Sequence, residues 1–209
     1  GVTQKNLVKL LKILKKLNTE RNYVVDPYDK QSMYEQIADS SEHLNPEDIA
    51  AFAGVESEFG KYAEPLNGGS ARGEFQIMQN TLKYLSKRAE DNGKPREANP
   101  LREQARVMSE LIPQHEKELS VTLGPDADIS ATDVYVKHNL GGGMGKKLLR
   151  AKDAAEVADI LPENVIEQNP SIYEGKTKSQ VMKEIQKRLD KKGKEFKFEK
   201  RGPLDFLEE

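Results

Sequence analysis

The stretch NPEDIAAFAGVESEFG, residues 45–60, decides how the centre of this chain folds. It opens with an asparagine, a proline and two acids, which suit the cap, the first turn and the positive dipole end of a helix. Ile49 and Phe52 recur at helical spacing, and the same spacing puts Glu56 on the apolar face just before Gly60 ends the element. A carboxylate there is unfavourable unless a cleft solvates it or a partner hydrogen-bonds it. Glu56 is therefore a candidate functional residue.

Helical patterns continue on both sides of this stretch. Ser32 with Glu35 has capping-box spacing and predicts a helix to about His43, and Thr177 with Gln180 begins another. Residues 67–70 form a turn signal, and residues 73–78 alternate polar and apolar side chains like a short strand. The expected fold class is mainly α (α+β), a helical domain with a small β-hairpin insertion. Further helices are expected over residues 81–91, 101–112, 131–138, 143–150 and 153–160.

The formal net charge of −2 conceals an uneven distribution. Residues 1–21 carry six Lys or Arg against one acid, and residues 176–201 carry eleven against four. The last eight residues hold three acids and no base, which leaves −11 for residues 22–175. Leucines at helical spacing over residues 7–17 predict a basic amphipathic helix, either docked on its own domain or contacting a partner. We expect an N-terminal helix and linker over 1–31, a central domain over 32–192, and a charged tail or linker over 193–209.

The composition excludes several classes of protein. Hydrophobic residues make up 36% and charged residues 33% of the 209, which is polar but leaves enough apolar residues for a core. No apolar run reaches the ~18 residues of a membrane span, so no transmembrane segment is expected. The lysine-rich start does not match a signal peptide. Without Cys and with three scattered His, the chain is expected to need neither a metal nor a cofactor.

Several familiar motifs fail on spacing. The glycine run before Lys146 lacks the first glycine and the hydroxyl residue of a phosphate-binding loop. His115 is not followed by a second His at zinc-helix spacing, and Ser57 is not in a Gly-x-Ser-x-Gly elbow. The basic C-terminal helix lacks interleaved aromatic residues, so no nucleic-acid partner is predicted.

One carboxylate beside a glycine-rich hairpin remains, together with Asn139 before a glycine run. Cleavage of a glycosidic bond needs an acid that protonates the leaving oxygen, and an apolar pocket raises the pKa of such an acid so that it is protonated near neutrality. Glu56 has the position for this role. Four apolar residues are candidates for the pocket, namely Ile49, Phe52, Phe59 and Phe75.

Residues 56–59 read Glu-Ser-Glu-Phe, residues 73–78 read Gly-Glu-Phe-Gln-Ile-Met, and residues 135–141 read Tyr-Val-Lys-His-Asn-Leu-Gly. In this order they resemble the motifs Glu-Ser-x-Phe, Gly-Leu-Met-Gln-Ile or Gly-Leu-Phe-Gln, and Tyr-Asn-Ala-Gly of lytic transglycosylases with a goose-lysozyme-like or soluble-transglycosylase domain. The third is closer to a Tyr-x-x-His-x-Leu-Gly form associated with phage and prophage members. Residues 161–173 are similar to the segment that follows in those members, so the resemblance covers about residues 45–190.

This resemblance implies a lysozyme-like fold and a peptidoglycan-cleaving enzyme. Glu56 would be the sole catalytic acid and base: it would protonate the bond between N-acetylmuramic acid and N-acetylglucosamine, then take the proton of the muramic C6 hydroxyl as a 1,6-anhydro ring closes. The partner would be the glycan strand, and the setting a phage virion that acts on the bacterial periplasm and cell wall. The basic terminal helices are candidates for contacts with other virion proteins. Residues implied to bind substrate are Ser57, Gln76, Asn139, Tyr135 and Tyr173.

Some positions depart from the family's pattern and leave alternatives open. Glu74 stands where Leu is usual, and strand alternation would place it on the same face as Gln76. A second carboxylate there would activate water and make the protein a hydrolysing muramidase. His138 replaces the usual Tyr before Asn139. A second alternative is an inactive lysozyme-like module that serves assembly, with Glu56 solvated, Gln76 satisfying backbone groups and Asn139 ending a helix.

Overall fold

A computed structural model describes residues 3–21, 27–64 and 70–201 of the protein. The chain forms two compact units, of which the first comprises Gly1–Asp29 with Arg201–Glu209 and the second comprises Lys30–Lys200. No described helix is long and apolar enough to cross a membrane.

The first unit contains the predicted basic helix, which is confirmed as α1 (Gln4–Arg21). Thr3 begins it, since its hydroxyl accepts the backbone N–H of Asn6 at 3.3 Å. Leu7 is buried, whereas Leu11, on the face that the leucine pattern predicts to be covered, is 43% exposed.

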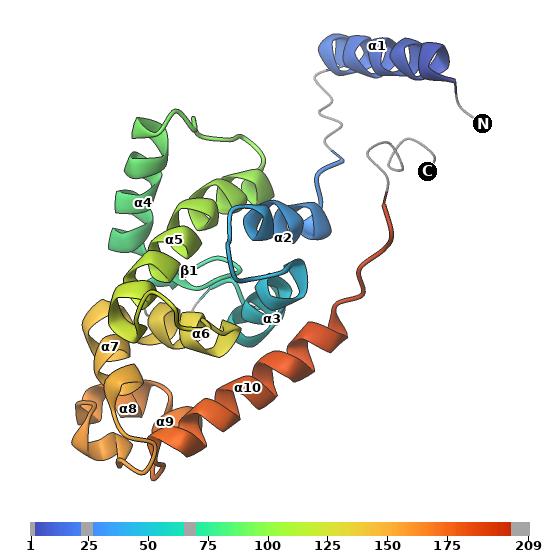
Figure 1. Cartoon of the computed structure of the whole chain (residues 1–209). Coiled ribbons are helices and arrows are strands. Elements are labelled where there is room, and N and C mark those ends of the chain that lie inside the picture. Colours follow the sequence, from blue (N-terminus) through green and yellow to red (C-terminus); the bar gives the residue numbers. More distant parts are fainter. Residues whose placement is uncertain (1–2, 22–26, 65–69, 202–209) are drawn as a thin grey trace. The chain divides into compact units, whose positions relative to one another are not determined.

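The second unit is mainly helical and carries one two-stranded sheet, as the sequence predicts (Figure 1). Helices α3 and α10 pack against each other, and α3 also contacts α2, which packs in turn on α5. Helix α5 lies against α4, α6 and α7. The elements in chain order are α2 (Lys30–Asp39), α3 (Pro46–Ser57), β1 (Ala71–Arg72), β2 (Ile77–Met78), α4 (Gln79–Asp91), α5 (Pro100–Leu123), α6 (Ala131–Leu140), α7 (Gly142–Arg150), a 3-10 turn (Val157–Asp159), α8 (Glu163–Gln168), α9 (Pro170–Tyr173) and α10 (Lys178–Glu195).

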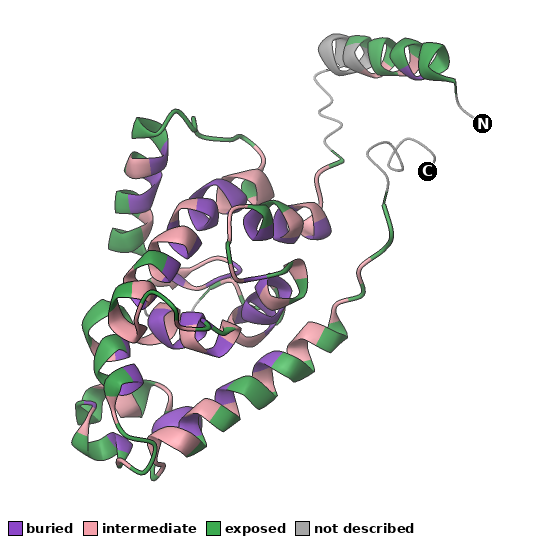
Figure 2. Ribbon diagram, viewed as in Figure 1, coloured by how far each residue is buried: buried purple, intermediate pink, exposed green. Residues whose placement is uncertain are grey.

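Helix α3 is the most completely buried helix of the core (Figure 2). Its predicted start is confirmed: the Asn45 side chain accepts the Asp48 N–H at 2.9 Å, and the Asp48 carboxylate accepts the Asn45 N–H at 3.0 Å. Ile49 and Phe52 are fully buried, as the spacing predicts. Since each fully buried side chain of this kind stabilises the fold by about 1.5–3 kcal/mol, α3 is held firmly in place. The residues that it positions at its end are therefore well fixed.

The hairpin differs from its prediction. Strands β1 and β2 pair antiparallel, with Ala71 opposite Met78 and Arg72 opposite Ile77. The segment between them, predicted as strand, is a turn in which Gly73 has φ +81° and Gln76 has φ +48°. The alternation of polar and apolar residues in this segment therefore does not describe the two faces of a strand.

Helix α2 also differs from its prediction at both ends. Ser32 lies inside the helix, which begins at Lys30, and the Glu35 carboxylate accepts from the Gln31 side chain at 2.7 Å. The helix ends at Asp39 instead of near His43. The reason is tertiary: the Glu116 carboxylate of α5 accepts the His43 N–H at 2.7 Å, which holds the following loop in a non-helical path.

Two predictions after residue 150 need correction. The helix expected over 153–160 is only a 3-10 turn over Val157–Asp159. The reason is that the Lys178 N–H donates to the Ala155 carbonyl at 2.9 Å, and that Glu156 and Thr177 form an antiparallel β-bridge. The boundary expected at residue 192 falls inside α10, and the compact unit extends to Lys200. Phe196 and Phe198 pack edge-on against each other and lie near Tyr34, so residues 193–200 belong to this unit.

Candidate active site

Glu56 lies one residue before the end of α3. The helix ends there because Glu58 and Phe59 turn into the left-handed region, with φ +48° and +59°, and the Phe59 N–H returns to the Ala53 carbonyl at 3.1 Å. The Glu56 side chain is partly exposed, but its Oε1 atom is buried and has no hydrogen-bond partner among the described residues. A buried carboxyl oxygen without a partner is unfavourable and calls for a functional explanation.

Helices α6 and α9 supply the polar residues around the Glu56 carboxyl. The α6 start is fixed by a capping box between Ser130 and Asp133. Tyr135 is buried edge-on against Phe52, with ring centroids 5.6 Å apart. The hydroxyl of Tyr173, in α9, donates to the Asn139 Oδ1 atom at 2.6 Å. Since this bond engages the oxygen of the Asn139 side chain, its NH₂ group supplies the hydrogen bond to the Glu56 carboxyl that lowers the pKa of Glu56, and a second N–H is left to meet a ligand.

Burial raises the pKa of the Glu56 carboxyl above its usual range. The charge of His138 and the polar groups of Tyr135 and Asn139 lower this pKa and offset part of the rise. The pKa values of Tyr135 and Tyr173 are raised in turn, first by burial and then by Glu56, so both phenols stay protonated. The group is therefore one acid that holds its proton longer than a free Glu, beside neutral hydrogen-bond donors.

His138 connects the hairpin to α6. Its Nε2 atom lies 2.7 Å from the Phe75 carbonyl oxygen, and because a carbonyl only accepts, this nitrogen carries a proton. His115 of α5 packs edge-on behind it, with ring centroids 5.9 Å apart. Burial lowers the pKa of His115 to about 3, so His115 is neutral. The ring of His138 thus separates the neutral His115 from the turn of the hairpin.

Glu74 does not take the position that strand alternation predicts. Its carboxylate is 3% exposed, accepts the Tyr34 hydroxyl at 2.5 Å, and forms an ion pair with Lys30 at 3.3 Å. Gly60 packs closely on it: a Cβ atom there would lie 2.7 Å from Glu74 Oε1. The expectation that Glu74 shares a strand face with Gln76 is therefore wrong, while the activation of water by Glu74 stays a prediction that its burial and its ion pair do not favour. Glu74 is a buried, neutralised anchor for the hairpin.

Ser57 and Gln76 also have structural partners. The Ser57 hydroxyl is buried 2.6 Å from the Glu74 carbonyl oxygen and accepts the Gly60 N–H at 2.8 Å. The Gln76 side-chain NH₂ donates to the Ala63 carbonyl at 3.0 Å and to the Gly73 carbonyl at 2.8 Å. These bonds join the end of α3 to the hairpin turn. They engage the Ser57 hydroxyl and the Gln76 NH₂ group with the backbone, and substrate binding by Ser57 and Gln76 stays a prediction.

Of the residues expected at the site, four meet around one point: Glu56, Tyr135, Asn139 and Tyr173. Phe52 lies beside them as expected, whereas the Phe59 ring packs near Phe196. Sequence reasoning missed the contacts of His115, Tyr34 and Lys30, because each lies on a different element from the residue that it contacts and no local spacing marks it. Among the described residues, no group of three or more His, Asp or Glu is arranged to hold a metal ion.

The chain was also compared with known proteins. Neither the scan against protein-family models nor the search of curated proteins finds a match to it.

Proposed function

We propose that this protein is a peptidoglycan-cleaving lytic transglycosylase built on a lysozyme-like fold, with Glu56 as its only catalytic acid and base. The observation that carries the proposal is the Glu56 carboxyl itself, with a buried, unpartnered oxygen and a raised pKa at the end of a rigid helix. This is the state that a general acid for glycosidic cleavage needs near neutral pH.

In the first step the protonated Glu56 carboxyl donates its proton to the glycosidic oxygen between N-acetylmuramic acid and N-acetylglucosamine. The C1–O4 bond breaks as positive charge develops on the muramic ring. The Asn139 NH₂ group, oriented by Tyr173, is placed to hold the sugar through an amide or hydroxyl oxygen. Tyr135, kept neutral, donates to the Glu56 carboxylate that remains.

In the second step the Glu56 carboxylate takes the proton of the muramic C6 hydroxyl, and O6 bonds to C1 to close a 1,6-anhydro ring. Glu56 returns to its protonated state, and no water is consumed. The intramolecular route is favoured because the reacting hydroxyl is already held next to C1. Glu74, the carboxylate that hydrolysis would require on the hairpin, is buried and paired with Lys30. These contacts support a transglycosylase over a hydrolysing muramidase.

The resemblance to phage and prophage members supports a virion as the setting, where the enzyme would open the bacterial wall locally. Two motif residues, Ser57 and Gln76, fix the hairpin beside Glu56 through backbone hydrogen bonds, which also supports this proposal.

Clearing of purified peptidoglycan tests the assignment of Glu56. The Glu56→Gln variant keeps the shape of the side chain and removes its acid, so we expect a loss of about a thousandfold or more in rate. Glu58→Gln is the matched control, because Glu58 is two residues away and exposed. It should clear peptidoglycan like the parent. Equal activity of the two variants would show that Glu56 is not the acid. Failure of the parent on every peptidoglycan would favour an inactive structural module.

A further inference from the structure

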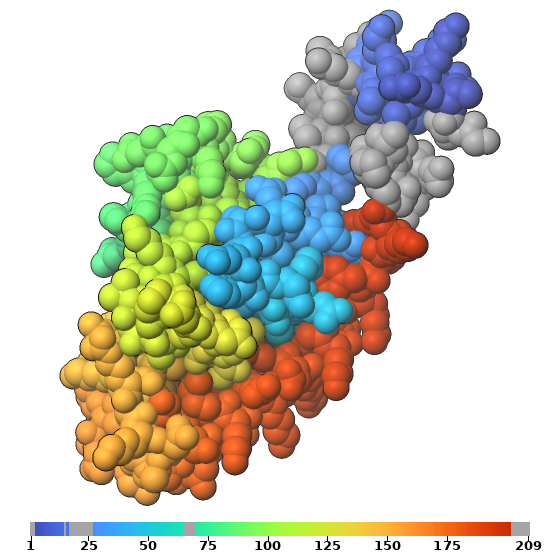
Figure 3. Space-filling view, in the orientation of Figure 1, coloured from blue at the N-terminus to red at the C-terminus, as the bar shows by residue number. Residues whose placement is uncertain are grey.

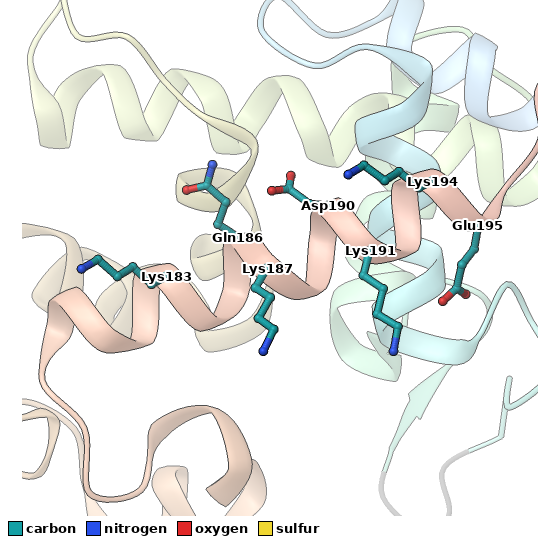
Figure 4. A pocket seen from close by; sticks show the side chains of 7 residues that line it. All are labelled: Lys183, Gln186, Lys187, Asp190, Lys191, Lys194 and Glu195. Carbon is teal, nitrogen blue, oxygen red and sulfur yellow. The ribbon is translucent and has the colours of Figure 1, made fainter.

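A line of lysines runs along the outer face of α10. Lys183, Lys187 and Lys191 recur every fourth residue, which places them on one side of the helix about 6 Å apart along its axis. All three are exposed, as is Lys194 at the end of the row. Figure 4 shows Lys187 and Lys191 extending in the same direction, with Lys183 one turn earlier. We call Lys183, Lys187 and Lys191 the lysine stripe.

The stripe lysines form no close ion pair with a described residue, although the charge of Lys187 contributes, beside the larger effect of Arg188, to lowering the pKa of the Glu184 carboxyl on the same helix. Elsewhere on α10 bases are paired, since Arg188 bonds Glu184 at 2.9 Å and Lys192 bonds Glu195 at 3.0 Å. Within the part of the chain that the structure describes, no residue forms an ion pair with a lysine of the stripe. Like charges four residues apart destabilise a helix by about 0.2–0.5 kcal/mol per pair. An anionic partner would relieve this repulsion.

The stripe lines a shallow, open surface groove whose lining residues all belong to α10. Gln186, Asp190, Lys194 and Glu195 complete its lining, so the groove holds both charges but is mainly basic. Helix α10 as a whole carries seven basic and three acidic residues, while residues 22–175 carry a net charge of −11. In the space-filling view the side chains of α10 project from the molecular surface (Figure 3). The positive field of this unit is therefore concentrated on α10.

The lining of the groove selects among anionic partners. It contains no aromatic side chain on which a nucleic-acid base could stack. Asp190 and Glu195 would repel a polymer with a phosphate at every unit but would accept the amino groups of a mixed-charge ligand. The peptide stems of peptidoglycan have this mixed character, since they carry several carboxylates and commonly a free amine.

We propose that the lysine stripe of α10 binds the carboxylate-bearing peptide stems of peptidoglycan and thereby holds the enzyme on the wall. The inference rests on the proposed function for the identity of the polymer. It assigns to α10 a role separate from the chemistry at Glu56: the acid cleaves a glycan strand while the stripe holds the stems. Such contacts raise the local concentration of an otherwise acidic protein at an anionic wall.

Sedimentation with purified sacculi tests the stripe. The parent is the full-length Glu56→Gln variant, so that binding is measured without cleavage. Changing Lys183, Lys187 and Lys191 together to Gln should weaken binding about tenfold, the 1.4 kcal/mol that three surface ion pairs supply at low salt. The matched control changes three exposed lysines outside the groove, Lys146, Lys147 and Lys152, to Gln and should bind like the parent. Circular dichroism and thermal unfolding check that both triple variants fold.

The outcomes separate this inference from the proposed function. Equal binding by the two triple variants, or a parent that does not sediment with the sacculi, would overturn the proposed role of the stripe. Sacculi stripped of their stems by an amidase identify the ligand. On these sacculi the parent should bind no more tightly than the stripe variant. An unchanged difference in binding between the two would also overturn the inference. Cleavage of intact sacculi by the wild-type protein is measured in parallel. Its absence, with stripe-dependent binding retained, would refute the catalytic function alone.

Discussion

Replacing Glu74 with Gln separates an anchoring role from a catalytic one. The Glu74 carboxylate is 3% exposed and lies between the Tyr34 hydroxyl and the Lys30 ammonium group. Gln has nearly the same shape but places an NH₂ group where one acceptor oxygen stood, so one of the two partners meets a donor. If Glu74 only anchors the hairpin, the substitution lowers stability and leaves the reaction unchanged.

The magnitude follows from the contacts. A hydrogen bond to a charged group contributes about 1.5–3 kcal/mol when its partner is buried. Lys30 is 40% exposed, so solvent screens its share of the loss. We expect the free energy of unfolding to fall by about 2 kcal/mol. For a unit of this size that corresponds to a fall of about 4–8 °C in Tm.

Thermal unfolding followed by circular dichroism measures the first effect, and clearing of peptidoglycan well below the Tm measures the second. Tyr34→Phe should destabilise the protein similarly, and the double variant should lose less than the sum, because the two side chains share one bond. A Glu74→Gln variant with an unchanged Tm and a hundredfold slower reaction would refute the reasoning and restore Glu74 as a catalytic carboxylate.

Three further predictions concern the residues around Glu56 and Glu74. His138→Gln keeps a donor for the Phe75 carbonyl but removes the charge that lowers the Glu56 pKa, so that pKa should rise. Because the reaction needs protonated Glu56, the alkaline limb of the pH–rate profile should move to higher pH. An unmoved limb would contradict this. Gly60→Ala should lower stability by about 2 kcal/mol or more in urea unfolding, because φ is +88° and the Cβ would lie 2.7 Å from Glu74 Oε1. The control Gly93→Ala, at φ +77° with nothing within 4 Å, should lower it by only about 1 kcal/mol, and equal losses would remove the steric argument. Finally, because the folded-state pKa of Glu56 is raised, the Glu56 carboxyl does not destabilise the fold at low pH and destabilises it increasingly as the pH rises through that pKa. Glu56→Gln should therefore raise the Tm at pH 8 more than at pH 4. A gain in Tm that is independent of pH would contradict the pKa assignment.

Local signals in the sequence were sufficient where the chain closes its own hydrogen bonds. The caps at Asn45 and Thr177 depend on residues three positions away, and both are present in the structure. The apolar face of α3 follows from spacing alone, and it carries Glu56 to the edge of the core. The mainly helical class with a small hairpin could be predicted for this reason.

Long-range contacts explain the predictions that were wrong. Glu116 ends α2 early from 73 residues away, by accepting the His43 N–H. Tyr34 and Lys30, both on α2, hold the Glu74 carboxylate in the core, and no sequence motif links α2 to the hairpin. The four-residue turn at 73–76 then sets the directions of Glu74 and Gln76, which strand alternation does not describe.

The site itself was predictable in part. Glu56 lies on a helix face that spacing predicts, whereas Tyr135 and Asn139 were expected at the site from the resemblance of residues 135–141 to a family motif, and the three side chains lie together. The partner of Asn139, Tyr173, lies 34 residues further on, and only the packing of α9 brings its hydroxyl to 2.6 Å. The bond from His138 to the Phe75 carbonyl likewise depends on the packing of α6 against the hairpin.

Mass spectrometry of the muropeptides released from purified sacculi tests the central claim most directly. A single acid at Glu56, with Glu74 committed to Tyr34 and Lys30, predicts products that end in 1,6-anhydro-N-acetylmuramic acid, each lighter by one water than a reducing-end muropeptide. The Glu56→Gln variant should release none of them. Reducing-end products, or anhydro products from the Glu56→Gln variant, would contradict the account.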